Sequence, residues 1–145
     1  MNTSGKYILY ADDDTDDQEL MHEVMQQTGS GVNIISVRNG EEVLDFLATL
    51  HKGEHYPSLI VLDINMPIIG GYQTQKLLKL NPVYSKIPVT IFSTSNLLEE
   101  KRKAKRYGAL SFISKPLYYR ELLKVCRTLA DFCNNEPEMV NGEKK

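Results

Sequence analysis

Acidic side chains follow two short apolar runs of this sequence. Asp12 and Asp13 follow the run 7–11, and Asp63 follows the run 58–62. Carboxylates packed together repel one another, so a cation or a shared proton must lie among them. All-oxygen ligands in a partly open site suit Mg²⁺, which pairs readily with phosphoryl oxygens. These residue types therefore predict an acidic pocket that holds a divalent cation.

Two other apolar runs lead into a hydroxyl and an amine. The run 88–92 precedes Ser93, and the run 110–113 leads through one serine to Lys115. A serine hydroxyl can donate to one phosphoryl oxygen, and a lysine ammonium can pair with another. With Asp63 as an ionised nucleophile, this set suits phosphoryl transfer, in which positioning and charge neutralisation do most of the work.

Five apolar runs alternate with five helix-like segments along the chain. The predicted strands are 7–11, 32–37, 58–62, 88–92 and 110–113. The predicted helices lie around 20–28, 40–50, 72–80, 97–107 and 119–133, and Asn39 with Glu42 predicts an N-cap for the second. This alternation indicates a parallel sheet with helices on both faces. Ligands of such sheets bind at the carboxyl ends of the strands, where the acidic, hydroxyl and amine groups would meet.

The bulk properties indicate one ordinary globular domain. The chain has 145 residues and a net charge of −2, which gives no electrostatic case for nucleic acid or membrane. Cys126 and Cys133 lie about 10 Å apart along one predicted helix, too far for a disulfide, so we expect reduced thiols.

No apolar run suits a membrane span or a signal peptide, so we expect a cytoplasmic protein. We expect the domain to cover 1–133 and the polar tail 134–145 to be disordered.

Four blocks of the sequence resemble the signature blocks of response-regulator receiver domains. They are residues 7–13, 59–71, 88–94 and 108–116. The resemblance covers about residues 5–133 and implies a flavodoxin-like, doubly wound α/β fold. By analogy with chemotaxis receivers, its five-stranded parallel sheet would have the order 2-1-3-4-5, with five helices around it.

The resemblance also implies a role for each residue of the predicted pocket. The implied roles are Mg²⁺ ligands for Asp12, Asp13, Asp63 and the backbone carbonyl of Asn65, phosphoacceptor for Asp63, switch hydroxyl for Ser93, phosphoryl-binding amine for Lys115, and aromatic switch for Phe112. It further implies that Asn65 and Ser95 tune the attacking water, and that the bond before Pro116 is cis. Gly70-Gly71 stands where the family has Asp-Gly, which affects only the stiffness of the loop. Phe112 lacks the hydroxyl of the commoner tyrosine, so one hydrogen bond of the switch is missing.

As a function, the resemblance implies a phosphorylation-activated switch of a two-component phosphorelay. A sensor histidine kinase or a phosphotransfer protein would donate the phosphoryl group to Asp63. The domain would catalyse only its own phosphorylation and dephosphorylation, and is otherwise not an enzyme. The downstream protein target would bind the face made by helix 4, strand 5 and helix 5. We expect a stand-alone receiver, since no output domain follows residue 133 in this sequence; a homodimer stays open.

The sequence also leaves other interpretations open. A phosphorylation-independent interaction module of the same fold is the main alternative, and a phosphohydrolase is less favoured because no second acid–base carboxylate is evident. The spacing of Asp12, Asp14, Asp16 and Glu23 imitates a calcium loop, but the sixth position is Asp17 instead of the required glycine. We therefore expect Asp14, Asp16 and Asp17 to be solvated turn and cap residues.

Five basic residues crowd the segment 101–106. The simpler interpretation is a solvated helix face. The sharper hypothesis places this segment on the output face, where it recruits an acidic partner. Nucleic acid is not favoured, because no reading helix or aromatic platform accompanies the charge.

Overall fold

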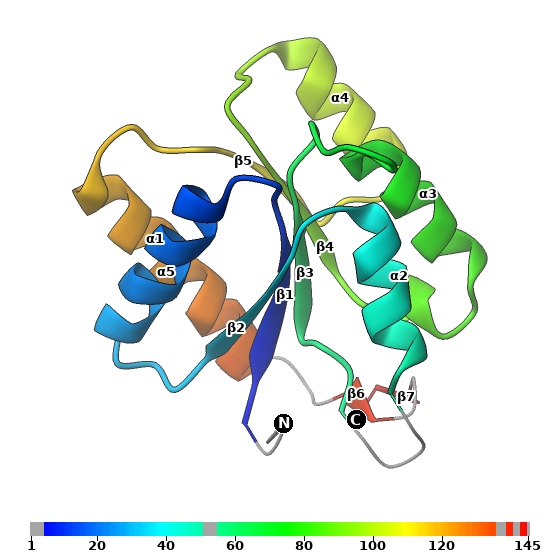
Figure 1. Cartoon of the computed structure of the whole chain (residues 1–145), viewed down its shortest axis with the longest axis horizontal. Coiled ribbons are helices and arrows are strands. Elements are labelled where there is room, and N and C mark those ends of the chain that lie inside the picture. The colour runs from blue at the N-terminus through cyan, green and yellow to red at the C-terminus, as the bar shows by residue number, and fades with distance from the viewer. Residues whose placement is uncertain (1–4, 51–54, 136–138, 141–142, 145) are drawn as a thin grey trace.

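The computed structural model describes residues 5–50, 55–135, 139–140 and 143–144. Its main sheet has five parallel strands in the order β2-β1-β3-β4-β5, which confirms the predicted topology (Figure 1). The strands are β1 (Tyr7–Ala11), β2 (Asn33–Val37), β3 (Leu59–Leu62), β4 (Val89–Ser93) and β5 (Ser111–Ser114). Each lies within one or two residues of its predicted place.

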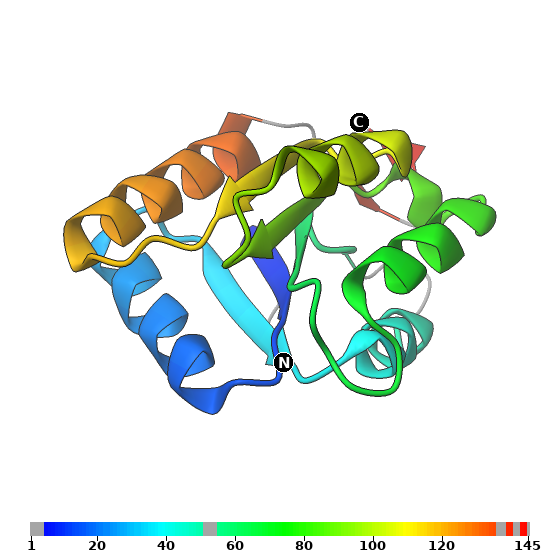
Figure 2. The same cartoon turned by 90° about the horizontal axis from the view of Figure 1, so that it is seen from above.

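Among the described residues, five α-helices cover the two faces of this sheet. They are α1 (Thr15–Gln27), α2 (Gly40–Ala48), α3 (Gly71–Leu80), α4 (Leu98–Arg106) and α5 (Tyr119–Asn135). Helices α1 and α5 lie on one face, and α2, α3 and α4 lie on the other (Figure 2). A short 3-10 turn, Tyr84–Lys86, leads into β4.

The strands are apolar on both sides because each face of the sheet has its own core. Along β1, Ile8 and Tyr10 face the core beneath α1 and α5, whereas Leu9 and Ala11 face the core beneath α2, α3 and α4. Side chains alternate between the faces of a strand, so a doubly covered strand needs apolar residues at every position. All five residues of β1 are buried.

Side-chain caps fix where the first two helices begin. Oδ1 of Asp14 accepts from the backbone N–H of Asp16 at 2.9 Å and caps α1, as predicted. Oδ1 of Asn39 accepts from the N–H of Glu42 at 2.9 Å and caps α2. The return bond differs from a regular capping box, because Glu42 Oε1 accepts from the N–H of Arg38 at 2.8 Å.

The C-terminal part differs from the expectation. Helix α5 ends at Asn135, two residues later than predicted. Beyond it, β6 (Met139–Val140) and β7 (Glu143–Lys144) form a short antiparallel pair where we expected no regular structure. Cys126 and Cys133 are buried and form no disulfide. Within the described ranges, no helix combines the length and the apolarity that a membrane crossing requires.

Candidate functional site

Three carboxylates converge at the carboxyl ends of β1 and β3. Oxygen atoms of Asp12, Asp13 and Asp63 all lie within 4.8 Å of one another. The two strands are neighbours in register, with Ala11 opposite Leu62, so the residues that follow them meet at one edge. Asp12 and Asp63 are buried, whereas Asp13 is exposed. The predicted acidic pocket is therefore present and opens to solvent on one side.

Lys115 reaches into this pocket from the end of β5. Its Nζ donates to Asp12 Oδ2 at 2.8 Å, to Asp17 Oδ2 at 3.1 Å and to Asp63 Oδ2 at 3.2 Å. The backbone N–H of Lys115 donates to the carbonyl of Ser93 at 2.6 Å, which continues the β4–β5 ladder and fixes the root of the side chain. Burial alone would lower the pKa of the Lys115 ammonium, but the hydrogen bond to Asp12 and the charge of Asp63 outweigh it and raise the pKa.

Asp63 is in an environment that disfavours its charge. Burial raises the pKa of its carboxyl, Lys115 opposes this shift, and the neighbouring Asp12 adds to it. The N–H of Asn65 donates to Asp63 Oδ1 at 3.2 Å, which holds the carboxylate against its own loop. A second positive charge beside Lys115 would keep Asp63 ionised. The all-oxygen set of Asp12, Asp13 and Asp63 has the donor chemistry that a hard divalent cation such as Mg²⁺ requires.

The two predicted switch residues lie on adjacent strands. Ser93 is the last residue of β4 and is buried, and its Oγ accepts from the N–H of Ser95 at 3.1 Å. Phe112 lies on β5 opposite Ile91 and is half-buried against the core beneath α2, α3 and α4. It also lines a groove of about 260 Å³ between α4 and β5. The Phe112 ring therefore faces the helix that its predicted rotation would affect.

Sequence reasoning missed two further partners of the buried Asp12. The Tyr10 hydroxyl donates to Asp12 Oδ2 at 2.5 Å. Gln18 Nε2 donates to the Asp12 carbonyl at 2.7 Å and to the Val37 carbonyl at 3.0 Å, which ties the ends of β1 and β2 to α1. A tyrosine within a fully buried strand was a usable signal, because its hydroxyl needs a partner.

Two expectations require correction. Asp17 is not simply a solvated residue, because the first turn of α1 faces the pocket and brings its carboxylate to Lys115. The bond before Pro116 is trans, since no cis peptide bond occurs among the described residues. The trans form of a bond to proline is close in energy to the cis form, so a short motif does not determine it.

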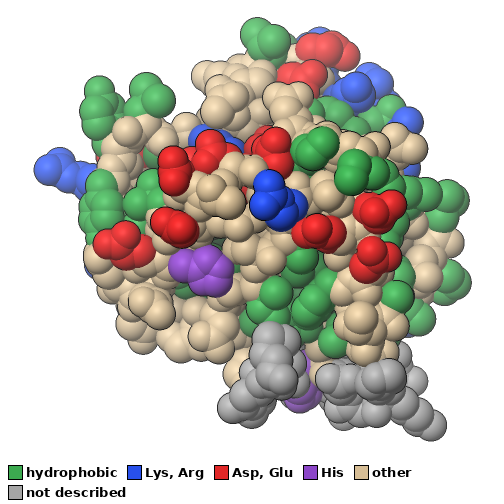
Figure 3. Space-filling view, viewed as in Figure 1, with side chains coloured by type: hydrophobic (Ala, Val, Ile, Leu, Met, Phe, Trp, Pro, Cys, Tyr) green, Lys and Arg blue, Asp and Glu red, His purple; other side chains and the backbone are tan. Residues whose placement is uncertain are grey.

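The basic segment 101–106 does not form a single face. Lys101 and Lys105 line the groove between α4 and β5. Arg106 lies on the other side of α4, where it lines a second groove against α3. Figure 3 shows basic side chains over α4, separate from the acidic side chains across the middle of the same view. The hypothesis of one basic output face is therefore only partly consistent with the structure.

Comparisons with known proteins agree with this geometry. The sequence pattern of the response regulator receiver domain matches residues 8–127. Protein PilG of Pseudomonas aeruginosa is 28% identical over 121 residues, which cover 83% of this chain and 84% of PilG. The polar-differentiation response regulator DivK of Brucella anthropi is 29% identical over 112 residues, which cover 77% and 85%. The crystal structure of the Mn²⁺-bound form of response regulator Rcp1 superposes with a TM-score of 0.76 at 26% identity and covers 88% of this chain and 94% of Rcp1.

The fold, the acidic pocket and the match over most of the chain define a receiver domain. This chain belongs to the response regulator receiver family of two-component signalling. Members of this family act in general as phosphorylation switches, bind Mg²⁺ at an acidic pocket, and interact with histidine kinases or phosphotransfer proteins.

Proposed function

We propose that Asp63 of this chain accepts a phosphoryl group from a sensor histidine kinase or a phosphotransfer protein. The observation that carries the proposal is the convergence of the Asp12, Asp13 and Asp63 carboxylates, with Lys115 Nζ 3.2 Å from Asp63. A cationic amine next to a nucleophilic carboxylate suits a reaction that adds negative charge at that carboxylate.

The metal ligands in this proposal are Asp12, Asp13, Asp63 and the backbone carbonyl of Asn65. A Mg²⁺ ion held there would offset the charge of the carboxylates and of the incoming phosphoryl oxygens. The donor chemistry of the pocket supports this assignment. The similar response regulator Rcp1 has been crystallised in a Mn²⁺-bound form, so a divalent cation is compatible with this fold.

In the phosphoryl transfer step, an Asp63 oxygen attacks the phosphorus of a phosphohistidine. The new O–P bond forms as the N–P bond breaks, and the leaving imidazole nitrogen takes up a proton from solvent. Lys115 shifts from Asp12 to a phosphoryl oxygen, and the Ser93 hydroxyl donates to another. Hydrolysis reverses the state when water attacks the same phosphorus and inorganic phosphate leaves. Asn65 and Ser95 lie two residues beyond Asp63 and Ser93, where they can orient that water.

The output of the switch is a change of surface. Movement of Ser93 toward the phosphoryl group would displace the loop that leads to α4, and Phe112 would rotate further inward. A downstream protein would read the altered face of α4, β5 and α5. The phosphoryl group biases a pre-existing equilibrium between two arrangements of this face. The domain turns over no substrate beyond its own phosphoryl group, and we place it in the cytoplasm, in keeping with its two buried thiols.

Incubation with acetyl phosphate and Mg²⁺, followed by intact mass measurement, tests the proposal. We expect one phosphoryl adduct in the unmodified protein and none in Asp63→Asn. Asp16→Asn is the matched control, because Asp16 is exposed in the first turn of α1 and should leave the adduct intact. Absence of the adduct in the unmodified protein would favour a phosphorylation-independent interaction module. Steady release of phosphate from a generic monoester would favour a phosphohydrolase.

A further inference from the structure

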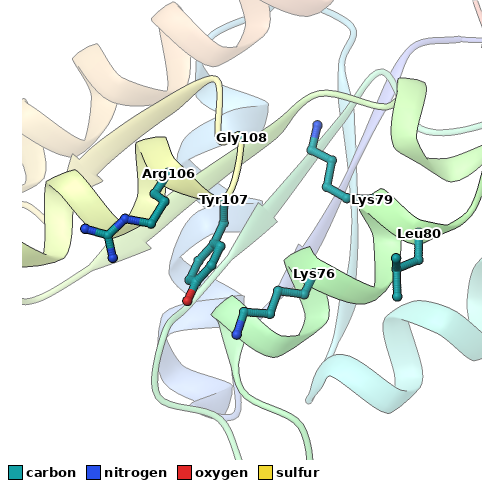
Figure 4. A pocket seen from close by; sticks show the side chains of 6 residues that line it. All are labelled: Lys76, Lys79, Leu80, Arg106, Tyr107 and Gly108. Carbon is teal, nitrogen blue, oxygen red and sulfur yellow. The ribbon is translucent and has the colours of Figure 1, made fainter.

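A second feature of this chain lies away from the acidic pocket, between α3 and α4. It is a groove of about 740 Å³, which we call the α3–α4 groove, lined by Lys76, Lys79, Leu80, Arg106, Tyr107 and Gly108 (Figure 4). Helix α3 begins at Gly71 beside Asp63 and reaches Leu80 about 13 Å further along its axis. The groove therefore lies toward the opposite end of the sheet from the acidic pocket.

The α3–α4 groove carries an excess of positive charge. Three of its six lining residues are cationic and none is acidic. The C-terminal ends of α3 and α4 both adjoin it, and each helix end contributes about half a negative charge, which leaves about two of the three positive charges uncompensated. In the described part of the chain, no carboxylate lies within ion-pair distance of Lys76, Lys79 or Arg106. These cations are thus available to an anionic partner.

Two lysines of the groove lie against an aromatic ring or the backbone. Lys76 Nζ lies 4.5 Å from the centre of the Tyr107 ring, and Figure 4 shows this ring between Lys76 and Arg106. Lys79 lies against Gly108, whose φ of +87° and lack of a side chain allow the approach. Lys103 Nζ lies 4.7 Å from the centre of the Tyr72 ring, which is 5.9 Å from that of Tyr107. An ammonium on a ring face directs part of its three N–H groups at the ring and keeps at least one to donate to a carboxylate.

The apolar surface of the groove favours an acidic peptide over a nucleic acid or a lipid surface as its ligand. Leu80 is 79% exposed at one end, and the Tyr107 ring lies at the centre. A nucleic acid or a lipid surface would place a long array of negative charge against a chain whose own net charge is −2. A short acidic segment with one apolar side chain meets both features: its carboxylates pair with the cations, and its apolar side chain packs on Leu80.

We propose that the α3–α4 groove binds an acidic segment of a partner protein, in which carboxylates flank one apolar side chain. The α4–β5 groove lies on the other side of the same helix and uses Lys101 and Lys105. A partner in the α3–α4 groove therefore leaves the α4–β5–α5 face accessible. The binding needs no phosphoryl group on Asp63.

A fluorescein-labelled peptide with glutamates on both sides of a central leucine serves as the probe. Its binding is followed by fluorescence polarisation and by backbone amide chemical shifts of the full chain, in EDTA and without acetyl phosphate. We expect saturable shifts at Lys76, Lys79, Tyr107 and Gly108. Binding should weaken at roughly 0.3 M salt, and replacement of the peptide leucine by serine should weaken it several-fold, because the first screens the ion pairs and the second removes the contact with Leu80.

Two charge-reversed variants provide the decisive comparison. Lys76→Glu/Lys79→Glu should weaken binding at least about tenfold, whereas Lys101→Glu/Lys105→Glu carries the same change of charge on the other side of α4 and should change it less than about twofold. Circular dichroism checks that both variants fold. Both should also form the phosphoryl adduct with acetyl phosphate as the unmodified protein does, so a loss of peptide binding can be told apart from a failure of the proposed function. Equal loss in both variants, shifts that map to the α4–β5 groove, or no saturable binding would overturn the proposal. The proposal would also be overturned if single-stranded DNA or phosphatidylserine vesicles bound more tightly than the peptide and Lys76→Glu/Lys79→Glu abolished that binding.

Discussion

The Tyr10 hydroxyl donates to Oδ2 of Asp12 at 2.5 Å, inside the acidic pocket. Residues two apart along a strand face the same way, so Tyr10 lies directly beneath the carboxylate that follows β1. The same Oδ2 accepts from Lys115 at 2.8 Å, and Oδ1 accepts from the N–H of Asp14 at 3.0 Å. The Asp12 carboxylate therefore accepts three hydrogen bonds without a metal ion. The hydrogen bond from Tyr10 lowers the electron density that this carboxylate offers to a cation.

The substitution Tyr10→Phe should strengthen Mg²⁺ binding. Loss of the hydroxyl removes one donor to Asp12 while the ring keeps its edge-on contact with Phe92. A hydrogen bond to a charged group is worth about 1.5–3 kcal/mol. Part of this should appear as roughly a three- to tenfold lower Kd for Mg²⁺, measured by isothermal titration calorimetry. Tyr7→Phe is the matched control, because its hydroxyl donates to the His55 carbonyl. An unchanged Kd in Tyr10→Phe would contradict this role.

Removal of the lysine should make the fold depend on a divalent cation. In Lys115→Met, the carboxylates of Asp12 and Asp63 lose their shared positive neighbour. We expect the free energy of unfolding in EDTA to fall by roughly 1–3 kcal/mol, since buried carboxylates are left without that donor. Saturating Mg²⁺ should raise the Tm of this variant more than that of the unmodified protein. Equal Mg²⁺ effects on both proteins would show that Lys115 does not neutralise the pocket.

The glycine that begins α3 should not tolerate a side chain. A Cβ on Gly71 would overlap the carbonyl oxygen of Asp63. Because the Asp63 carbonyl belongs to the backbone and cannot rotate away as a side chain could, the first turn of α3 and the phosphoacceptor loop must move apart. We expect Gly71→Ala to lower the free energy of unfolding by about 1–3 kcal/mol in urea titrations and to slow adduct formation at Asp63. Gly5→Ala, whose Cβ would be 3.9 Å from its nearest neighbour, should do neither. If Gly71→Ala had the stability and the rate of adduct formation of the unmodified protein, the close contact between Gly71 and the Asp63 carbonyl would not be required.

Stability at high pH should depend on the thiol of Cys126. Burial raises its pKa from the usual 9.0 to about 11 in the folded protein. The unfolded chain loses this proton first, so the stabilising contribution is complete below pH 9.0 and is lost as the pH rises toward 11.

The stability difference between the unmodified protein and Cys126→Ala should therefore narrow by about 1–2 kcal/mol between about pH 8 and pH 10.5. Urea titrations under reducing conditions measure it. If the stability difference between the two proteins were the same at both pH values, the folded protein would not retain the proton of the Cys126 thiol.

Much of the architecture could be predicted because single residues mark the ends of its elements. Asp14 and Asn39 cap helices, and Asn81 before Pro82 ends α3. Doubly covered strands produce unbroken apolar runs, so the parallel sheet was visible in the sequence. The convergence of Asp12, Asp13, Asp63 and Lys115 followed from the rule that parallel strands bring their carboxyl ends to one edge.

The remaining features depend on angles between elements, which local sequence does not encode. Asp17 reaches Lys115 only because of how α1 is inclined to β5, 98 residues later in the chain. The α3–α4 groove needs Lys76 and Tyr107 to meet from different helices. The charges of the segment 101–106 all have the same sign, but its side chains divide between two grooves. Successive side chains of a helix point in different directions around its axis.

The most direct test of the account is chemical identification of the residue that carries the phosphoryl group. Borohydride reduces an aspartyl phosphate to homoserine and leaves a free aspartate unchanged, so tandem mass spectrometry can locate the modified position. After acetyl phosphate and Mg²⁺, we predict homoserine at position 63 and its absence when EDTA replaces Mg²⁺. An unchanged aspartate at position 63, or homoserine at Asp12 or Asp13 instead, would contradict the assignment of Asp63 as the phosphoacceptor.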